Sequence, residues 1–85
     1  MPDERVKVLV VDDTAPIRNL LERILEEDYR MCSAPDGVAA LEVFERERPE
    51  IMVLDVNMPR MGVLEVVREL RSRGEEEVIL LILTG

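Results

Sequence analysis

The sequence contains no histidine or tryptophan, and only 1 residue each of cysteine, tyrosine and phenylalanine. With a lone cysteine, Cys32, and no histidine, the chain cannot form an internal disulfide, a zinc finger or a cysteine–histidine nucleophilic pair. The scarcity of aromatic side chains means that the core has to be aliphatic. A single cysteine suits a reducing compartment, so we expect a cytoplasmic protein.

Basic residues are in the minority: 11 lysines and arginines stand against 19 acidic residues, for a formal net charge of −8. This charge would repel a phosphate backbone, and direct nucleic-acid binding is therefore not expected. Long apolar runs are missing too, so we expect neither a signal peptide nor contact with a membrane. The length of 85 residues, with 47% hydrophobic and 35% charged residues, is that of one small globular domain.

Short apolar runs alternate with amphipathic segments along the chain. Continuous apolar runs predict buried strands, and apolar residues at every third and fourth position predict helices. The expected strands are Val6 to Val11, Tyr29 to Ala34, Ile51 to Val56 and Val78 to Leu83. The first expected helix begins after Thr14 and continues through Leu25. The second follows Gly37 and extends up to Pro49, and the third runs from about Val63 to about Arg73. This β-α-β-α-β-α-β order predicts one α/β domain with a parallel sheet, right-handed crossovers and helices on both faces.

The helical periodicity also predicts which side chains face the core. The expected inward residues are Ile17, Leu20, Leu21, Ile24 and Leu25 in the first helix, Ala40, Leu41 and Phe44 in the second, and Leu64, Val67 and Leu70 in the third. The pairs Arg18–Glu22 and Arg23–Glu27 have i, i+4 spacing and are expected on the solvent face of the first helix.

Polar side chains follow three of the expected strands. Asp12 and Asp13 follow the first strand, Asp55 lies near the end of the third, and Thr84 ends the fourth. If these strands are neighbours, the side chains converge at one edge of the sheet, where ligands bind in open α/β folds. Each of these residues has a purely structural alternative: helix caps for the aspartates after the first strand, a turn for Asp55 and an ordinary strand position for Thr84.

Converging carboxylates require a compensating charge. Two carboxylates about 4 Å apart repel by roughly 4 kcal/mol at an effective dielectric constant near 20, so a cation is expected between them. Oxygen ligands without histidine or cysteine suit Mg²⁺. A carboxylate beside Mg²⁺ can act as a nucleophile on phosphorus, and the hydroxyl of Thr84 could donate a hydrogen bond to a phosphoryl oxygen.

Five segments, VLVVDDTAPIRNLL, APDGVAALE, IMVLDVNMPRM, LEVVRELR and VILLILTG, resemble in order and spacing the receiver domain of response regulators from two-component signalling systems. The resemblance implies a flavodoxin-like α/β fold in which these four strands have the order 2-1-3-4. It also implies that Asp55 accepts the phosphoryl group, that Thr84 is the switch hydroxyl, and that the donor is a phosphohistidine on a sensor histidine kinase or phosphotransfer protein. The implied Mg²⁺ ligands are Asp12, Asp13, Asp55 and the backbone carbonyl of Asn57, with Asp13 binding directly.

The sequence departs from the family pattern in two places. Receiver domains have five βα units, so residues 1–85 are interpreted as a single truncated domain without the fourth helix, the fifth strand and the fifth helix. The family lysine after strand five is missing with them, and Lys7, the only lysine, lies at the start of the first strand, far from Asp55. Val63 stands where the family has glycine, a departure that would strain a backbone with positive φ.

Truncation would leave the fourth strand exposed. Its apolar side chains would lose their cover, and its free edge would be a template for pairing with another chain. We therefore predict a homo-oligomer, a dimer formed through Val78 to Leu83. An alternative to phosphoryl switching follows from this surface: a fragment that no longer switches and serves as a self-associating structural module. An aspartate-nucleophile phosphatase is a weaker alternative because the first strand lacks Asp-x-Asp, and we expect the chain not to be an enzyme.

Overall fold

The computed structural model of the protein describes residues 3–58 and 61–84. Strands and helices alternate along these residues in the predicted order. The strands are β1 (Lys7–Val11), β2 (Arg30–Ala34), β3 (Ile51–Asp55) and β4 (Ile79–Leu83). The helices are α1 (Ala15–Leu25), α2 (Gly37–Glu47) and α3 (Val63–Ser72). Pro59 and Arg60, between β3 and α3, and Gly85 lie outside the described residues.

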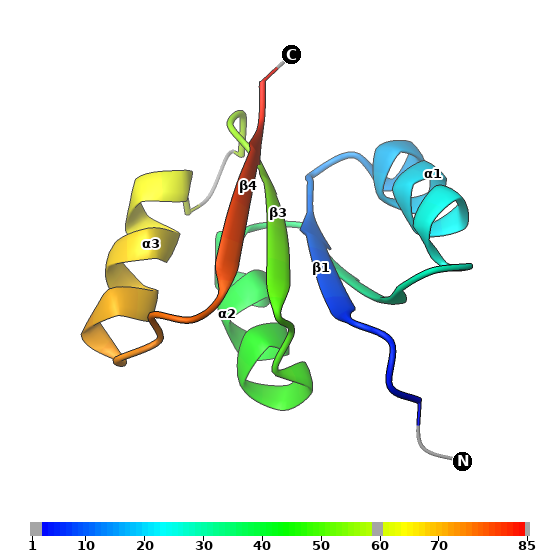
Figure 1. Ribbon diagram of the computed structural model, residues 1–85. Helices are drawn as coiled ribbons and strands as arrows, with labels where there is room; N and C mark the ends of the chain where they lie inside the picture. The colour runs from blue at the N-terminus through cyan, green and yellow to red at the C-terminus, as the bar shows by residue number, and fades with distance from the viewer. Residues whose placement is uncertain (1–2, 59–60, 85) are drawn as a thin grey trace.

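The strands form one parallel sheet in the order β2-β1-β3-β4, as predicted. Helix α1 covers one face, and α2 and α3 cover the other (Figure 1). This arrangement follows from the chain order, because each parallel crossover has to return the chain to the same end of the sheet through a helix. All the strands therefore have their carboxyl ends at the same end of the sheet. Within the described ranges, no helix combines the length and the apolar character needed to cross a membrane.

The core is divided by the sheet into two unequal clusters. The larger lies between the sheet and helices α2 and α3, and includes Leu9, Met52, Leu54, Phe44 and Leu70. The smaller lies under α1 and is built on Val8, Val10 and Val53. Successive residues of β1 and β3 point alternately into the two clusters because both faces of these strands are covered. The predicted inward residues of α2, which are Ala40, Leu41 and Phe44, are all buried.

The prediction for the inward face of α1 is wrong for three of its five residues. Ile17, Leu20 and Ile24 are 39%, 52% and 60% exposed, and no residue of α1 is fully buried. Leu21 does pack on the small cluster. The exposed apolar side chains of α1 have no neighbour to cover them among the described residues.

The predicted face of α3 is also partly wrong. Val66 and Leu70, one turn apart, are the buried residues of this helix, whereas Leu64 is 70% exposed and Val67 is half-buried. Gly37 explains why Val66 is one of the buried residues, because a Cβ atom at position 37 would lie 2.6 Å from Cβ of Met61 and 2.9 Å from a methyl group of Val66. The missing side chain lets Val66 pack directly on the start of α2, and this contact fixes the rotation of α3.

Val63 fits the start of α3 without strain. Gly62 precedes the helix with a φ of −75°, and Val63 is the first helical residue. The positive φ angles of the described residues belong to Arg48 (51°) and Gly74 (79°), not to Val63. The family glycine is therefore not needed for backbone reasons at this position.

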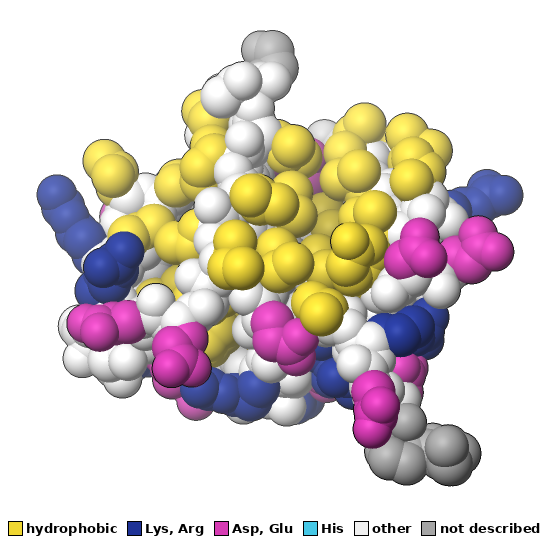
Figure 2. Space-filling model, viewed as in Figure 1, with side chains coloured by type: hydrophobic (Ala, Val, Ile, Leu, Met, Phe, Trp, Pro, Cys, Tyr) yellow, Lys and Arg dark blue, Asp and Glu magenta, His cyan; other side chains and the backbone are white. Residues whose placement is uncertain are grey.

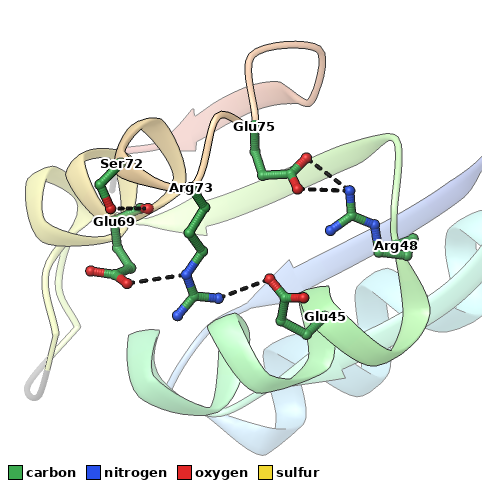
Figure 3. Close-up of polar contacts among 6 residues, drawn as sticks. All are labelled: Glu45, Arg48, Glu69, Ser72, Arg73 and Glu75. Carbon is green, nitrogen blue, oxygen red and sulfur yellow. Dashed lines mark hydrogen bonds and ion pairs between the residues drawn. The ribbon is translucent and has the colours of Figure 1, made fainter.

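Ion pairs tie the end of α3 and the following loop to α2 (Figure 3). Arg73 donates from Nη1 to Glu45 of α2 and from Nε to Glu69 of its own helix, both at 3.1 Å. Arg48, which follows α2, donates from Nη2 to both carboxylate oxygens of Glu75 at 2.8 Å, and its guanidinium lies 4.7 Å from the ring centroid of Phe44. These contacts fix the segment that leads into β4.

Candidate metal centre

Three aspartates converge at the carboxyl ends of β1 and β3. Val11 lies opposite Leu54 in the sheet, so Asp12 and Asp55 follow at the same level on neighbouring strands. Asp12, Asp13 and Asp55 each offer a carboxylate oxygen, and the three atoms lie within 4.8 Å of one another. We call these residues the acidic cluster. The predicted convergence of the carboxylates is thus found in the structure.

The loop after β1 holds Asp12 tightly. Asp12 is only 5% exposed, its N–H donates to the carbonyl of Ala34, and its Oδ1 accepts a hydrogen bond of 2.8 Å from the N–H of Thr14. Asp13 is exposed, and its Oδ1 accepts a hydrogen bond of 3.3 Å from the hydroxyl of Thr14. The carboxylate that faces solvent is the one that the family resemblance assigns to direct metal binding.

Neither aspartate of this loop serves as the N-cap of α1. Thr14 is the cap residue, with extended backbone angles, and its carbonyl accepts the first helical hydrogen bonds from Ile17 and Arg18. Asp12 and Asp13 are therefore not the cap residues of α1, although Oδ1 of Asp12 bonds to the N–H of the cap residue Thr14.

Asp55 ends β3 and begins a turn. It is half-buried, and its Oδ1 accepts a hydrogen bond of 3.1 Å from the N–H of Asn57. This contact fixes one oxygen of Asp55 and places Asn57, which is exposed, beside the acidic cluster. The proposed contribution of the Asn57 carbonyl to metal binding stays a prediction. Met58 is buried in the larger core cluster and anchors the turn.

Thr84 lies next to the acidic cluster in the sheet. Leu83 is opposite Asp55 in the register, and its carbonyl accepts a hydrogen bond of 3.1 Å from the N–H of Val56. Thr84 is the next residue along this neighbouring strand and is exposed. The parallel pairing of β3 and β4 thus brings Thr84 to the end of the sheet where the acidic cluster lies. Its role as a switch stays a prediction.

Sequence reasoning missed one residue near the acidic cluster. Arg18 was expected to pair with Glu22 on the solvent face of α1, but its Nη1 donates to the backbone carbonyl of Asp12 at 2.6 Å and its side chain is half-buried. Helical periodicity does not reveal this contact, because it depends on where the preceding loop lies relative to the helix. The only available signal was that Arg18 follows Asp12 by six positions and has a long side chain.

The only lysine lies at the other end of the sheet, as predicted. Lys7 begins β1, and its Nζ donates to Glu47 at the end of α2 at 3.0 Å. This hydrogen bond, with the charge of Lys7, lowers the pKa of Glu47 below its usual value. Lys7 is therefore engaged far from Asp55.

The acidic cluster fits a hard divalent cation. Its donors are carboxylate oxygens, and their separation of up to 4.8 Å is close to the roughly 4.2 Å between opposite ligands of an octahedral Mg²⁺ with metal–oxygen distances near 2.1 Å. Calcium would favour more oxygen ligands than these residues provide. The donor set thus agrees with the predicted Mg²⁺.

The pattern of the response regulator receiver domain matches residues 8–85. The response regulator MprA of Mycobacterium ulcerans is 47% identical over 78 residues, which cover 91% of this chain and 34% of that protein. MprA of Mycobacterium leprae is 46% identical over the same length, with the same coverage. The chain therefore spans about a third of the length of these relatives.

Solved structures show the same fold. The chemotaxis protein CheY4 of Vibrio cholerae superposes with a TM-score of 0.85 at 32% identity, covering 92% of this chain and 67% of that one. The N-terminal domain of a response regulator receiver protein from Methanoculleus marisnigri superposes with a TM-score of 0.84 at 29% identity, covering 92% and 65%. The similarity confirms the predicted flavodoxin-like fold up to its fourth strand.

Proposed function

Because this chain belongs to the family of response regulator receiver domains, we propose that it accepts a phosphoryl group on Asp55 in a Mg²⁺-dependent reaction that switches signalling. The donor is a phosphohistidine of a sensor histidine kinase or a phosphotransfer protein. The observation that carries this proposal is the convergence of Asp12, Asp13 and Asp55 within 4.8 Å at the carboxyl ends of two neighbouring strands.

Each residue of the site has a defined task in the transfer. A carboxylate oxygen of Asp55 forms a bond to phosphorus while the bond from phosphorus to the donor imidazole breaks, and the imidazole nitrogen keeps the electron pair and takes up a proton. Asp12 and Asp13 would hold Mg²⁺ with Asp55 and the carbonyl of Asn57. When bound, this ion neutralises charge on the transferring group. The hydroxyl of Thr84 donates to a phosphoryl oxygen.

The acidic cluster favours this function over the two alternatives. A structural module that no longer switches would not need three mutually repelling carboxylates at one edge of the sheet. A phosphatase of the Asp-x-Asp type would need both acids on one strand end with a residue between them, whereas Asp12 and Asp13 are adjacent. We infer that the chain does not turn over phosphate esters as an enzyme. We also infer that phosphoryl transfer to Asp55 takes place in the cytoplasm, where the free thiol of Cys32 stays reduced.

The donor needs a docking surface next to Asp55, because its phosphoryl group has to reach the carboxylate. Ile17 and Leu20 of α1 and Val56 after β3 are exposed apolar residues on elements that flank the acidic cluster. We infer that a kinase or phosphotransfer protein packs on them. Leu20→Glu should slow transfer from a phosphohistidine protein but leave transfer from acetyl phosphate unchanged. An equal effect on both donors would contradict a docking role.

The acceptor function is tested with a small phosphodonor. The purified chain is incubated with acetyl phosphate and Mg²⁺, and its intact mass is measured beside an Asp55→Asn control. We expect one phosphoryl adduct on the wild type, none on Asp55→Asn, and much less on the wild type after EDTA. No adduct on a wild-type chain that is folded by circular dichroism would overturn the proposal and favour the structural module.

Strand β4 is the basis of a second proposal about partners. Ile79 and Leu81 point to the same face as Ile51 and Val53, and both are exposed. Figure 2 shows hydrophobic side chains gathered over this face between β4 and α1. The strand has neither proline nor charge, the features that normally protect an edge from pairing.

We infer that β4 pairs with β4 of a second copy. Antiparallel pairing about a two-fold axis would join two sheets through backbone hydrogen bonds and close the assembly. It would also keep the acidic segment Glu75–Glu77 of one copy one strand length, roughly 17 Å, from that of the other, beyond the Debye length of about 8 Å at physiological salt. Antiparallel pairing therefore keeps the two Glu75–Glu77 segments apart.

Analytical ultracentrifugation tests this association. We expect the wild type to form a concentration-dependent dimer and Leu81→Lys to remain a monomer. Leu64→Lys is the matched control, because it places the same charge on an equally aliphatic, exposed side chain of α3, away from β4. A stable wild-type monomer at high concentration would contradict the proposed dimer but not the phosphoryl transfer.

A further inference from the structure

Arg18 makes a contact that the proposed function does not use. Its guanidinium donates from Nη1 to the backbone carbonyl of Asp12 at 2.6 Å, although Glu22 lies one turn further along the same helix. The side chain is half-buried between α1 and the loop after β1. Arg18 therefore connects the helix to the loop that carries two of the three acids.

The carbonyl that Arg18 binds belongs to the peptide unit between Asp12 and Asp13. The N–H of Asp12 is held by Ala34, and its side chain is held by the N–H of Thr14. These two contacts fix the chain before and after the peptide but leave the plane of the peptide itself able to rotate. The hydrogen bond from Arg18 fixes this plane and thereby the direction in which the Asp13 side chain leaves the backbone.

We propose that Arg18 is a positioning residue that holds the Asp12–Asp13 peptide so that the carboxylate of Asp13 faces those of Asp12 and Asp55. Asp13 depends on this contact more than its neighbours do. It is exposed, and among the described residues its carboxylate is held by a single hydrogen bond of 3.3 Å, from the hydroxyl of Thr14. The inference rests on the proposed function insofar as the acidic cluster is a Mg²⁺ site.

Charge and positioning predict opposite effects of removing Arg18. As a positive charge near the acidic cluster, Arg18 repels a cation, so the loss of the charge alone would tighten Mg²⁺ binding. As a positioning residue, it organises the ligands, so its loss would weaken Mg²⁺ binding. The direction of the change in Kd therefore distinguishes the two roles.

The test measures Mg²⁺ affinity by isothermal titration calorimetry for three variants. Arg18→Gln should weaken binding about tenfold, in line with the effect of losing a residue that orients a metal ligand. Arg18→Lys, which keeps a donor and the charge, should recover most of the affinity. Arg23→Gln removes the same charge from an exposed position of the same helix and should leave Kd unchanged or slightly lower. Unchanged or tighter binding by Arg18→Gln would overturn the proposal.

A second measurement does not depend on Mg²⁺ or on phosphoryl transfer. The heteronuclear ¹⁵N NOE of the Asp13 amide reports the order of this peptide in the metal-free chain. We expect a clear decrease in Arg18→Gln, recovery in Arg18→Lys and no change in Arg23→Gln, with urea unfolding confirming that all are folded. An unchanged NOE in Arg18→Gln would refute the positioning role. If the wild type binds no Mg²⁺, the proposed function fails, and the NOE still decides whether Arg18 orders the peptide.

Discussion

At the scale of single residues, Gly37 controls how closely two helices approach. A Cβ atom at this position would collide with the backbone oxygen and Cβ of Met61 and with a methyl group of Val66. Backbone atoms cannot move aside as a flexible side chain can, so an added methyl group has to displace α3 or the chain that leads into it. Gly37 is therefore a packing residue, and its φ angle is not the reason for the glycine.

Gly37→Ala should lower the free energy of unfolding by about 2 kcal/mol, because overpacking costs about 1–3 kcal/mol. Gly62→Ala is the matched control, since a Cβ there meets no atom within 4 Å and φ is −75°. Urea unfolding followed by circular dichroism gives both values. An equal, small effect of the two substitutions would show that α3 is not held against Gly37.

Cys32 is a second residue whose surroundings have a measurable effect. Burial raises the pKa of its thiol to about 11, and the carboxylate of Glu47 acts in the same direction. In the unfolded chain the thiol titrates near 8.5. Folding then favours the protonated thiol, so its contribution to stability is complete below the unfolded pKa and is lost as the pH rises through the folded pKa.

We therefore expect the wild type to lose stability relative to Cys32→Ala between about pH 8.5 and pH 11. Thermal unfolding of both chains across this range measures the difference. Parallel profiles would mean that the thiol is more accessible than its burial indicates.

At the scale of elements, α1 and α3 differ in how they are anchored. Helix α3 buries Val66 and Leu70, and Arg73 at its C-terminal end bonds to Glu45 of α2 (Figure 3). Helix α1 has no fully buried residue. Similar amphipathic sequences thus lead to a firmly packed helix and a lightly packed one, because the sheet and α2 offer α3 a larger apolar surface.

Two leucine truncations compare these helices directly. Leu70→Ala should cost about 2–5 kcal/mol of stability, because Leu70 is 1% exposed and its loss leaves a cavity. Leu20→Ala should cost less than about 0.5 kcal/mol, because Leu20 is 52% exposed. The midpoints of urea unfolding at low protein concentration, where association is weakest, give both values. A comparable loss for Leu20→Ala would show that the outer face of α1 is covered in solution.

At the scale of the whole molecule, folding gathers negative charge at the carboxyl ends of the strands. The net charge of −8 is not spread evenly, since three carboxylates share the acidic cluster. Folding brings these charges together, and a cation bound at the acidic cluster would compensate them. A cation that binds only the folded chain stabilises it by mass action.

Mg²⁺ at 100 times its Kd should raise the free energy of unfolding by about 2.7 kcal/mol. Asp13→Asn should stabilise the metal-free chain, because it removes one of the repelling charges, and should lose most of the gain from Mg²⁺. Unfolding curves at matched ionic strength exclude general screening as the cause. If Asp13→Asn gained as much from Mg²⁺ as the wild type, the ion would not bind at the acidic cluster.

The sequence predicted features that depend on local pattern and missed those that depend on what packs nearby. Short aliphatic runs ending in acids located β1 and β3 and the convergence of Asp55 with the aspartates after β1. The wrong residues in α1 and α3 share a cause: a helix with a wide apolar stripe does not show which part of it the sheet will cover. Arg18 was missed because its partner is a backbone carbonyl in a preceding loop, which carries no side-chain signal.

The light packing of α1 has a consequence for how the acidic cluster could be observed. Its first residue, Ala15, follows Asp13 by two positions, and its side chains reach the core only in part. Its amide protons should therefore exchange with solvent faster than those of α2, which buries five residues. Any event that immobilises Asp13 would slow this exchange along the helix, so deuterium uptake by α1 would record the state of the acidic cluster without a covalently attached probe.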